Sequence, residues 1–142
     1  MNFADAARKG LNANERAVAA RQEMDAVLHE ASKQLTEALG GELTLRFAGS
    51  IPAMVEAKRR GRDVPLTGIL EVVGKSDRYK YLAEVGLGEL GYPVWLIWGN
   101  ERGYATNRTE FEVALSKLLE SRVTGERIDW VLTGSGSEPS GA

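Results

Sequence analysis

The chain has 142 residues, of which 43% are hydrophobic and 27% charged, proportions typical of one folded domain. It contains no cysteine, which excludes disulfides, thiolate nucleophiles and Cys-ligated metal centres. The formal net charge of −2 is too small to imply a nucleic-acid or membrane partner by itself. No stretch approaches the roughly 20 apolar residues of a membrane span, and residues 1–11 lack the apolar run of a secretory signal. We therefore expect a cytoplasmic protein without a membrane partner.

The sequence predicts three parts: an N-terminal segment (1–11), a single α+β domain (12–132) and a disordered tail (133–142). The tail, TGSGSEPSGA, has no large hydrophobic residue to anchor it. Within the domain, apolar residues three and four positions apart predict an amphipathic helix from Asn12 to Leu39. Asn12 and Glu15 resemble a capping box, and Gly40-Gly41 is a typical helix end. Many apolar positions of this helix are alanine, which allows another element to approach closely.

Residues 43–47 alternate apolar and polar side chains, which predicts a strand. Residues 52–60 are consistent with a short helix that leads into a basic loop. Residues 66–73 and 78–87 predict a β-hairpin around a tight turn at Gly74-Lys75-Ser76-Asp77. Pairing Val73 with Arg78 brings two tyrosines into the core. The other expected pairs are Val72 with Tyr79, Leu70 with Tyr81, Gly68 with Ala83, Glu71 with Lys80 and Ile69 with Leu82.

Residues 94–98 predict a central strand, and residues 104–106 a short returning strand. Asn107 and Glu110 indicate the start of a second helix that ends near Arg122. Residues 128–132 alternate again and predict a last strand. The expected fold is therefore α+β, a mostly antiparallel sheet of five or six strands with two long helices on one face, in the order α-β-β-β-β-β-α-β.

Two helices can cover only one face of this sheet, and the other face would expose much apolar surface. A dimer interface, cover from residues 49–63, or a ligand or partner surface would each explain it. Alternation directs Trp98 and Trp130 toward the helices but Trp95 toward the open face. The expected partner-binding residues are Trp95, Ile97, Arg46 and Arg102.

Residues 58–80 contain seven cations and three anions, a net charge of +4. Phosphate contact is the alternative hypothesis for this segment, and a solvated loop at 59–62 is the simple one. The candidate phosphate-binding residues are Lys58, Arg59, Arg60, Arg62, Lys75 and Arg78.

The sequence predicts no catalytic residue, metal ligand or cofactor. The single histidine, His29, falls at the edge of the first helix's apolar stripe, where a surface position is expected. The element order is similar to that of PD-(D/E)xK nucleases, but neither Glu71 nor Glu84 is followed by the lysine that such a site needs. As an acid and base pair these two glutamates are also poor candidates, since Lys80 is expected opposite Glu71.

These observations favour a small non-catalytic protein that acts by occupying a macromolecular partner. Chaperones, immunity proteins, antitoxins and phage-encoded inhibitors are of this size and build. A protein partner and a homodimer are expected. Nucleic-acid or phosphate binding through residues 58–80 is the alternative, and an enzyme of unrecognised type is the third hypothesis.

Overall fold

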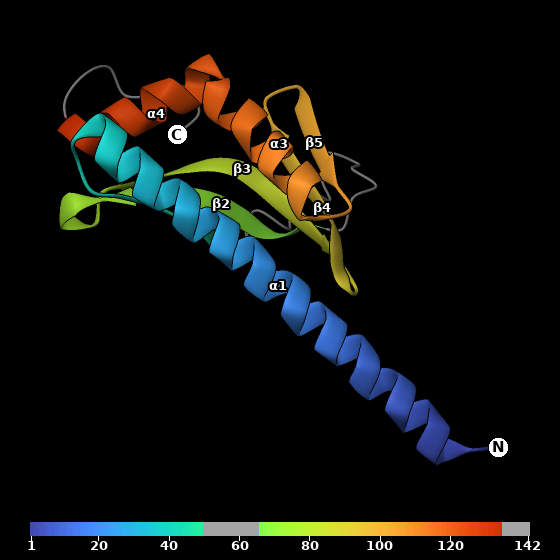
Figure 1. Ribbon diagram of the computed structural model, residues 1–142. Helices are drawn as coiled ribbons and strands as arrows, with labels where there is room; N and C mark the ends of the chain where they lie inside the picture. Colours follow the sequence, from blue (N-terminus) through green and yellow to red (C-terminus); the bar gives the residue numbers. More distant parts are fainter. Residues whose placement is uncertain (50–65, 135–142) are drawn as a thin grey trace.

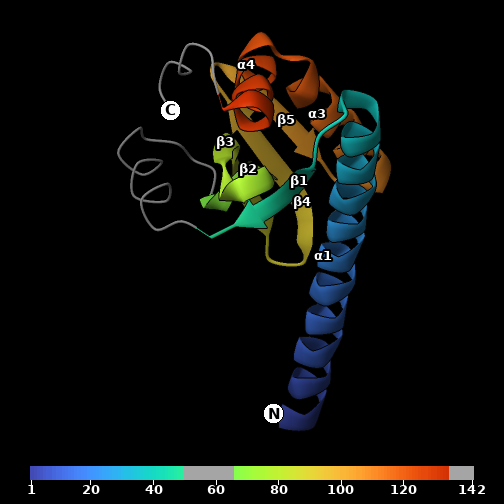
Figure 2. The ribbon, with the colours of Figure 1, turned by 90° about the vertical axis from the view of Figure 1, so that its left-hand side faces the viewer.

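The computed structural model describes residues 1–49 and 66–134, and it confirms the α+β class. Within these residues the five strands form one antiparallel sheet, in the order β1-β2-β3-β4-β5. Helices α1, α3 and α4 lie on one face of it (Figures 1 and 2). The elements are α1 (Phe3–Leu39), β1 (Leu43–Ala48), β2 (Leu66–Gly74), a 3-10 turn η1 (Lys75–Asp77), β3 (Tyr79–Gly88), β4 (Gly91–Trp98), β5 (Glu101–Ala105), α3 (Arg108–Glu120) and α4 (Arg122–Thr133).

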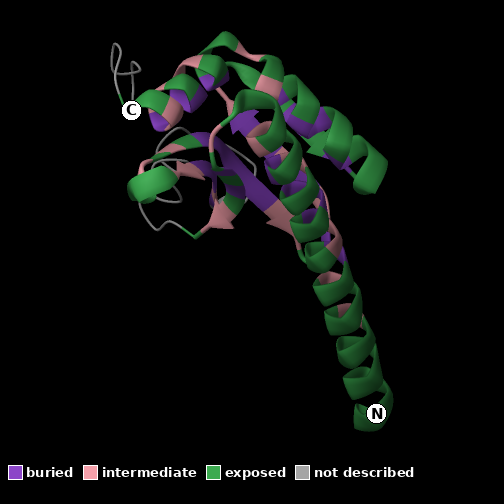
Figure 3. Cartoon of the chain, turned by 60° about the vertical axis from the view of Figure 1, so that its left-hand side comes forward, coloured by how far each residue is buried: buried purple, intermediate pink, exposed green. Residues whose placement is uncertain are grey.

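The hydrophobic core lies between these helices and the sheet face that they cover, which we call the inner face (Figure 3). All three helices and the strands contribute to it, so the expected placement of the two long helices on one face is confirmed. Burial of these side chains supplies the main driving force for folding. The largest fully buried members of the core include Met24, Leu43, Leu70, Val72, Leu96, Phe111, Leu118 and Val131.

Helix α1 begins at Phe3, well before the expected start at Asn12. Its N-cap is Asn2, whose side-chain oxygen accepts a hydrogen bond from the Asp5 amide at 3.1 Å. The helix ends as expected at Gly40, which adopts a left-handed φ of 72°. The apolar repeat marks where the helix reaches the sheet rather than where it begins, because residues 1–12 are all exposed.

Close approach of α1 to the sheet occurs at Gly91, the first residue of β4. A Cβ on Gly91 would lie 2.5 Å from the Cβ of Ala20. The helix can therefore come this close only because position 91 has no side chain and position 20 has a small one. The sequence predicted that Gly68 pairs with Ala83. That prediction is wrong, since Gly68 pairs with Val85.

The predicted register of the β2–β3 hairpin is also wrong. Tyr79 pairs with Val73, because the turn holds only three residues and closes with a hydrogen bond of 2.7 Å from the Gly74 amide to the Arg78 carbonyl. Two consecutive non-glycine residues, Ser76 and Asp77, adopt positive φ in this turn, an uncommon conformation that composition does not reveal. A one-residue slip transfers side chains to the opposite face of the sheet.

A second irregularity lies inside the hairpin, where the register shifts between Leu70 and Glu71. Glu71 pairs with Tyr81 and Leu70 with Ala83, so that Leu82 is the extra residue of a β-bulge. Leu82 is 1% exposed and belongs to the core, not to the open face as expected. Tyr79 and Tyr81 are exposed, not buried as expected.

The predicted last strand, residues 128–132, is helical and belongs to α4. Ser121 caps this helix by accepting a hydrogen bond from the Thr124 amide, and Gly134 ends it with a φ of 64°. Buried positions three and four apart (Thr124, Ile128 and Val131) suit a helix as well as five alternating residues suit a strand. Trp130 therefore packs against the core from a helix.

The free edge of β1 is closed by hydroxyl groups of α1. The Leu45 amide donates to Ser32 Oγ at 2.8 Å, and the Leu43 amide donates to Thr36 Oγ1 at 3.1 Å. Ser32 and Thr36 are one helical turn apart, which matches the spacing of alternate strand residues. These contacts satisfy strand amides that would otherwise be open to pairing with another strand.

Candidate protein-binding surface

The face of the sheet opposite the helices, here the outer face, carries an aromatic pair on β4 and β5. Trp95 lies directly opposite Tyr104 in the register, and their ring centroids are 5.6 Å apart with planes inclined by 56°. Tyr104 is 55% exposed and Trp95 is half-buried. We call Trp95, Tyr104 and the neighbouring exposed Arg102 the aromatic patch.

Packing beneath β5 determines which side chains face outward. A Cβ on Gly103 would lie 2.9 Å from the Cβ of Ala114 and 3.3 Å from Cζ3 of Trp98, so only glycine lets α3 sit this close to the strand. With Gly103 held on the inner face, alternation directs Arg102 and Tyr104 to the outer face.

The chain that follows β5 is held by a capping network at the start of α3. Asn107 Oδ1 accepts a hydrogen bond from the Glu110 amide at 2.9 Å. The Glu110 carboxylate accepts from the Thr106 hydroxyl at 2.6 Å and from the Thr106 amide at 2.8 Å, and these two bonds lower the pKa of Glu110. The expected helix start at Asn107 and Glu110 is confirmed, and it anchors the strand that bears Tyr104.

Among the expected partner-binding residues, Trp95 and Arg102 lie together on adjacent strands. Ile97 pairs with Arg102 in the register but is only 5% exposed, so its side chain offers no contact surface. Tyr104 belongs to the patch and the sequence analysis missed it. Its place opposite Trp95 follows from the two-residue turn at Gly99-Asn100, a signal that was present in the sequence.

Arg46 lies far from the patch, on β1 at the other side of the sheet. Three strand spacings separate β1 from β4, roughly 14 Å at the usual distance between strands. Arg46 Nε donates to Glu71 Oε1 at 2.6 Å, with the arginine side chain 58% exposed and the glutamate side chain 7% exposed. The ion pair neutralises a buried carboxylate, so we assign Arg46 a structural role.

The expected ion pair of Glu71 with Lys80 is absent for a topological reason. Tyr81 stands opposite Glu71, while Lys80 stands opposite Val72 on the inner side, with its ammonium 4.4 Å from the ring centroid of Trp130. That distance is typical of a cation–π contact.

The β3 tyrosines form a second aromatic group that the wrong register hid. Tyr79 is 60% exposed. Tyr81 is 37% exposed, and the Arg127 guanidinium lies 4.5 Å from its ring centroid.

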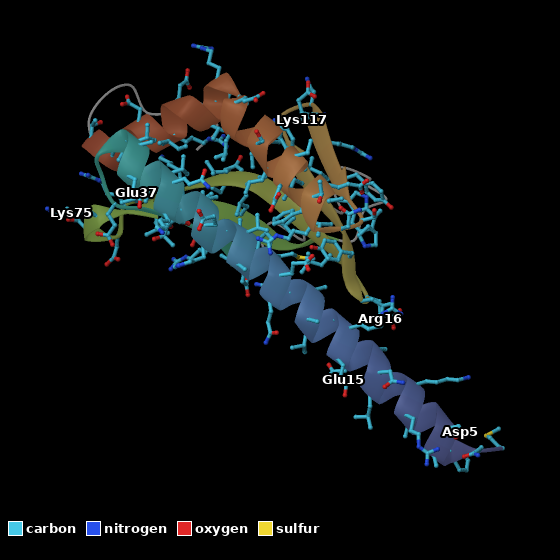
Figure 4. All side chains as sticks on the ribbon, in the orientation of Figure 1. Asp5, Glu15, Arg16, Glu37, Lys75 and Lys117 are labelled. Carbon is cyan, nitrogen blue, oxygen red and sulfur yellow. The ribbon has the colours of Figure 1, made fainter. Side chains whose placement is uncertain are left out.

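Of the candidate phosphate-binding residues, Lys58, Arg59, Arg60 and Arg62 lie outside the described residues, as do the expected short helix at 52–60 and most of the segment 49–63. Lys75 is exposed in the turn η1, at the tip of the hairpin (Figure 4). Arg78 donates from Nε to the Val131 carbonyl at 3.0 Å and from Nη2 to the Leu132 carbonyl at 3.1 Å. It thus holds the C-terminal end of α4 on the hairpin.

His29 is exposed on α1. In residues 1–49 and 66–134, no group of three or more His, Asp or Glu side chains is placed to hold a metal ion. No helix in the same ranges is long and apolar enough to cross a membrane.

Comparisons with protein-family models, with curated proteins and with solved structures find no match to this chain.

Proposed function

We propose that the chain is a cytoplasmic, non-catalytic binding protein that recognises a protein partner through the aromatic patch. The observation that carries the proposal is the Trp95–Tyr104 pair, two contacting rings on the outer face with Tyr104 more than half exposed. Tryptophan, tyrosine and arginine are the residues most enriched among those that dominate binding energy at protein interfaces. Arg102 completes this set. The lack of cysteine fits a reducing compartment.

The position of the patch at the end of the sheet also favours a protein partner. In the described part of the chain, β5 pairs with β4 alone. An extended segment of a partner could add to this edge, with main-chain hydrogen bonds to β5 and side-chain contacts to Tyr104 and Arg102. A small ligand would need a deeper and more enclosed site.

The test is capture of partners from the native host by the full chain and by the Tyr104→Asp variant. Val113→Asp is the matched control, because Val113 is a similarly exposed apolar residue, 51% accessible, on α3. We expect at least one protein to be retained by the wild type and by Val113→Asp and lost by Tyr104→Asp. With that protein purified, Tyr104→Asp and Trp95→Asp should weaken binding by roughly 30-fold or more, as for other central interface residues. Equal affinity for all variants would reject the patch.

The first half of α1 favours a second candidate, association of two copies of the chain. Residues 3–16 project beyond the sheet, and the labelled Asp5, Glu15 and Arg16 lie on this projection (Figures 1 and 4). The exposed fractions of Phe3, Leu11 and Val18 are 75%, 64% and 47%. Their spacing, with Ala7 between the first two, places them along one side of the helix.

An isolated helix of this length is marginal in water, and Gly10, Asn12 and Asn14 lower its propensity further. We infer that a second copy packs against it in antiparallel orientation. Arg8 and Glu15 lie along the same edge of this apolar side, two turns apart. Antiparallel packing of two copies therefore brings Arg8 of one copy next to Glu15 of the other.

Sedimentation equilibrium over a range of concentrations tests this homodimer. A dimer that Leu11→Asp disrupts and Val113→Asp leaves intact would support it. A wild-type chain that remains monomeric at all concentrations would contradict it and leave the aromatic-patch proposal untouched.

Phosphate or nucleic-acid binding through residues 58–80 is the remaining alternative from the sequence. Among its described candidates, Arg78 is engaged by α4 and Lys75 is exposed. Affinity that falls steeply with salt concentration would favour this alternative over an aromatic contact.

A further inference from the structure

The main-chain groups at the free edge of β5 have a defined phase. The two-residue turn at Gly99-Asn100 makes Glu101 the first residue of β5 that exchanges hydrogen bonds with β4. Because the pattern alternates along an antiparallel pair, Gly103 bonds to β4 as well. The amides and carbonyls of Arg102 and Tyr104 therefore point away from β4, toward the free edge.

The next residue in the same phase, Thr106, supports this assignment. Its amide donates to Glu110 Oε1 at 2.8 Å and not to β4. In the described part of the chain β5 pairs with β4 alone, and the amides of Arg102 and Tyr104 have no acceptor there. The edge thus offers two neighbouring residues to a further strand.

These two residues are complementary to each other across a two-fold axis. When a second β5 lies antiparallel with the axis at Gly103, Arg102 of each copy stands opposite Tyr104 of the other. Both residues direct their amide and carbonyl at the opposite strand, so each pair exchanges two main-chain hydrogen bonds. A shift of the register by two residues is less favourable, because it sets Arg102 against its own counterpart or brings the strand to the capped Thr106.

The outer-face side chains favour the same register. Arg102 lies directly across from Tyr104 of the other copy, where a guanidinium can stack on the phenol ring. The Tyr104 ring contacts Trp95 of its own copy, with 5.6 Å between the ring centroids. The arginine of the second copy therefore extends the aromatic patch of the first, and the patch is incomplete without it.

The inner side of the edge adds complementary charges. Gly103 lies beneath Ala114 of α3. Glu110 and Lys117, four residues before and three after Ala114, lie on the same side of the helix, and both are exposed. The two-fold axis makes the two α3 helices antiparallel, so Glu110 of each copy faces Lys117 of the other. Both hydrogen bonds from Thr106 use Oε1 of Glu110, which leaves Oε2 for the ammonium group.

We propose that two copies of the chain pair through β5, with Gly103 at the two-fold axis, into one continuous sheet whose helices all lie on one face. Two residue pairs form a small interface, so the association is weak. The inference goes beyond the proposed function, because the copies can pair whether or not another protein binds the aromatic patch. An extended segment of a partner at this edge would displace the second copy.

The first test is disulfide trapping of the full chain, which has no cysteine of its own. Arg102→Cys and Tyr104→Cys are mixed and oxidised, with a tag on one variant to resolve mixed from like dimers. Opposite residues have Cα atoms about 5.5 Å apart, within disulfide range. Like positions lie two residues apart along the strands, roughly 8 Å and too far. One Arg102–Tyr104 pair stays intact in the mixed dimer.

We expect the mixture to form more disulfide-linked dimer than either variant alone. Arg122→Cys mixed with Tyr104→Cys is the matched control, because Arg122 is an exposed arginine on α4, and it should give only the background yield. Equal yields from the mixture, the single variants and the control would overturn the proposal.

Sedimentation equilibrium separates this pairing from association through α1. Lys117→Glu sets two glutamates against each other at both symmetric contacts and should raise the dimer dissociation constant by roughly fivefold or more. Lys75→Glu, the same charge change at an exposed lysine in η1, and Leu11→Asp should leave it unchanged. Association that Leu11→Asp abolishes and Lys117→Glu leaves intact, or a wild-type chain that is monomeric at about 1 mM, would overturn the pairing through β5.

Discussion

The two edges of the sheet are treated differently. At β1, Ser32 and Thr36 of α1 accept hydrogen bonds from strand amides, and the edge is closed by the chain itself. At β5, no hydroxyl group of the described residues accepts a hydrogen bond from the strand edge in this way, and Arg102 and Tyr104 of this strand are exposed. An edge that is closed from within serves stability, whereas an open edge beside an aromatic pair is suited to recognition. The proposed function depends on this asymmetry.

The largest stability effect is expected from opening the closed edge. Ser32→Ala combined with Thr36→Val removes both acceptors while keeping size and shape close to the original. The Leu43 and Leu45 amides are then left without partners, at about 1–3 kcal/mol each. Urea unfolding should show this loss, and Ser116→Ala on the exposed side of α3 should change the free energy of unfolding by less than about 0.5 kcal/mol. A double variant as stable as the wild type would show that this edge needs no cap.

A smaller loss is expected under the open edge at Gly103. Gly103→Val forces a branched side chain against Ala114 and Trp98, and overpacking of this kind costs about 1–3 kcal/mol. Gly10→Ala is the matched control, because its Cβ would meet nothing within 4 Å, and it should stabilise the helix by about 0.5–1 kcal/mol. The two glycine replacements should therefore shift the melting temperature in opposite directions, and shifts of the same sign would contradict the packing described.

Removal of Arg46 tests whether the ion pair near the closed edge is structural. Arg46→Met keeps most of the apolar stem but leaves the buried Glu71 carboxylate without its cation. We expect a loss of about 1 kcal/mol, since the arginine is more than half exposed and water partly replaces it. The loss caused by Arg46→Met should be smaller in the Glu71→Gln background, because a neutral side chain at position 71 needs no cation. A double-mutant cycle that shows no coupling between Arg46 and Glu71 would reject the structural role.

Tyr92 links α1 to β4, and its ionisation should make the stability of the protein depend weakly on pH in the alkaline range. Burial, and then the hydrogen bond of 2.6 Å that its hydroxyl donates to Glu23 Oε1, raise the pKa of Tyr92 above its usual value near 10. The contribution is fully present below pH 10. Above pH 10 the unfolded chain ionises first, so stability falls as pH rises toward the folded pKa. Tyr92→Phe should lose less stability above pH 10 than the wild type, while Tyr79→Phe should follow the wild type; identical profiles for all three would contradict this.

The class, the placement of the helices on one face of the sheet and the start of α3 could be predicted because they follow from long apolar repeats and a capping motif. The hairpin register could not, because it depends on Ser76 and Asp77 at positive φ and on a bulge at Leu82. Each is a choice among backbone conformations that neighbouring packing decides. The strand prediction for residues 128–132 was wrong for a related reason. Five alternating residues fit a strand and a helix equally well until Ser121 and Gly134 are recognised as helix caps.

The candidate binding surface likewise contains residues that the sequence could predict and residues that it could not. Trp95 and Arg102 could be assigned to the outer face by alternation, and Tyr104 follows from the same rule once the turn is placed. Arg46 could not be separated from them, because strand order is invisible in a list of alternating residues.

Hydrogen–deuterium exchange of the full chain with and without its captured partner tests the recognition surface most directly. Binding at the open edge should slow exchange of amides in residues 101–105 and around Trp95, and leave the exposed side of α3 near Val113 unchanged. Protection confined to residues 3–18, or to the basic residues 58–80, would contradict this and move the interface to the projecting helix or to the phosphate-binding alternative.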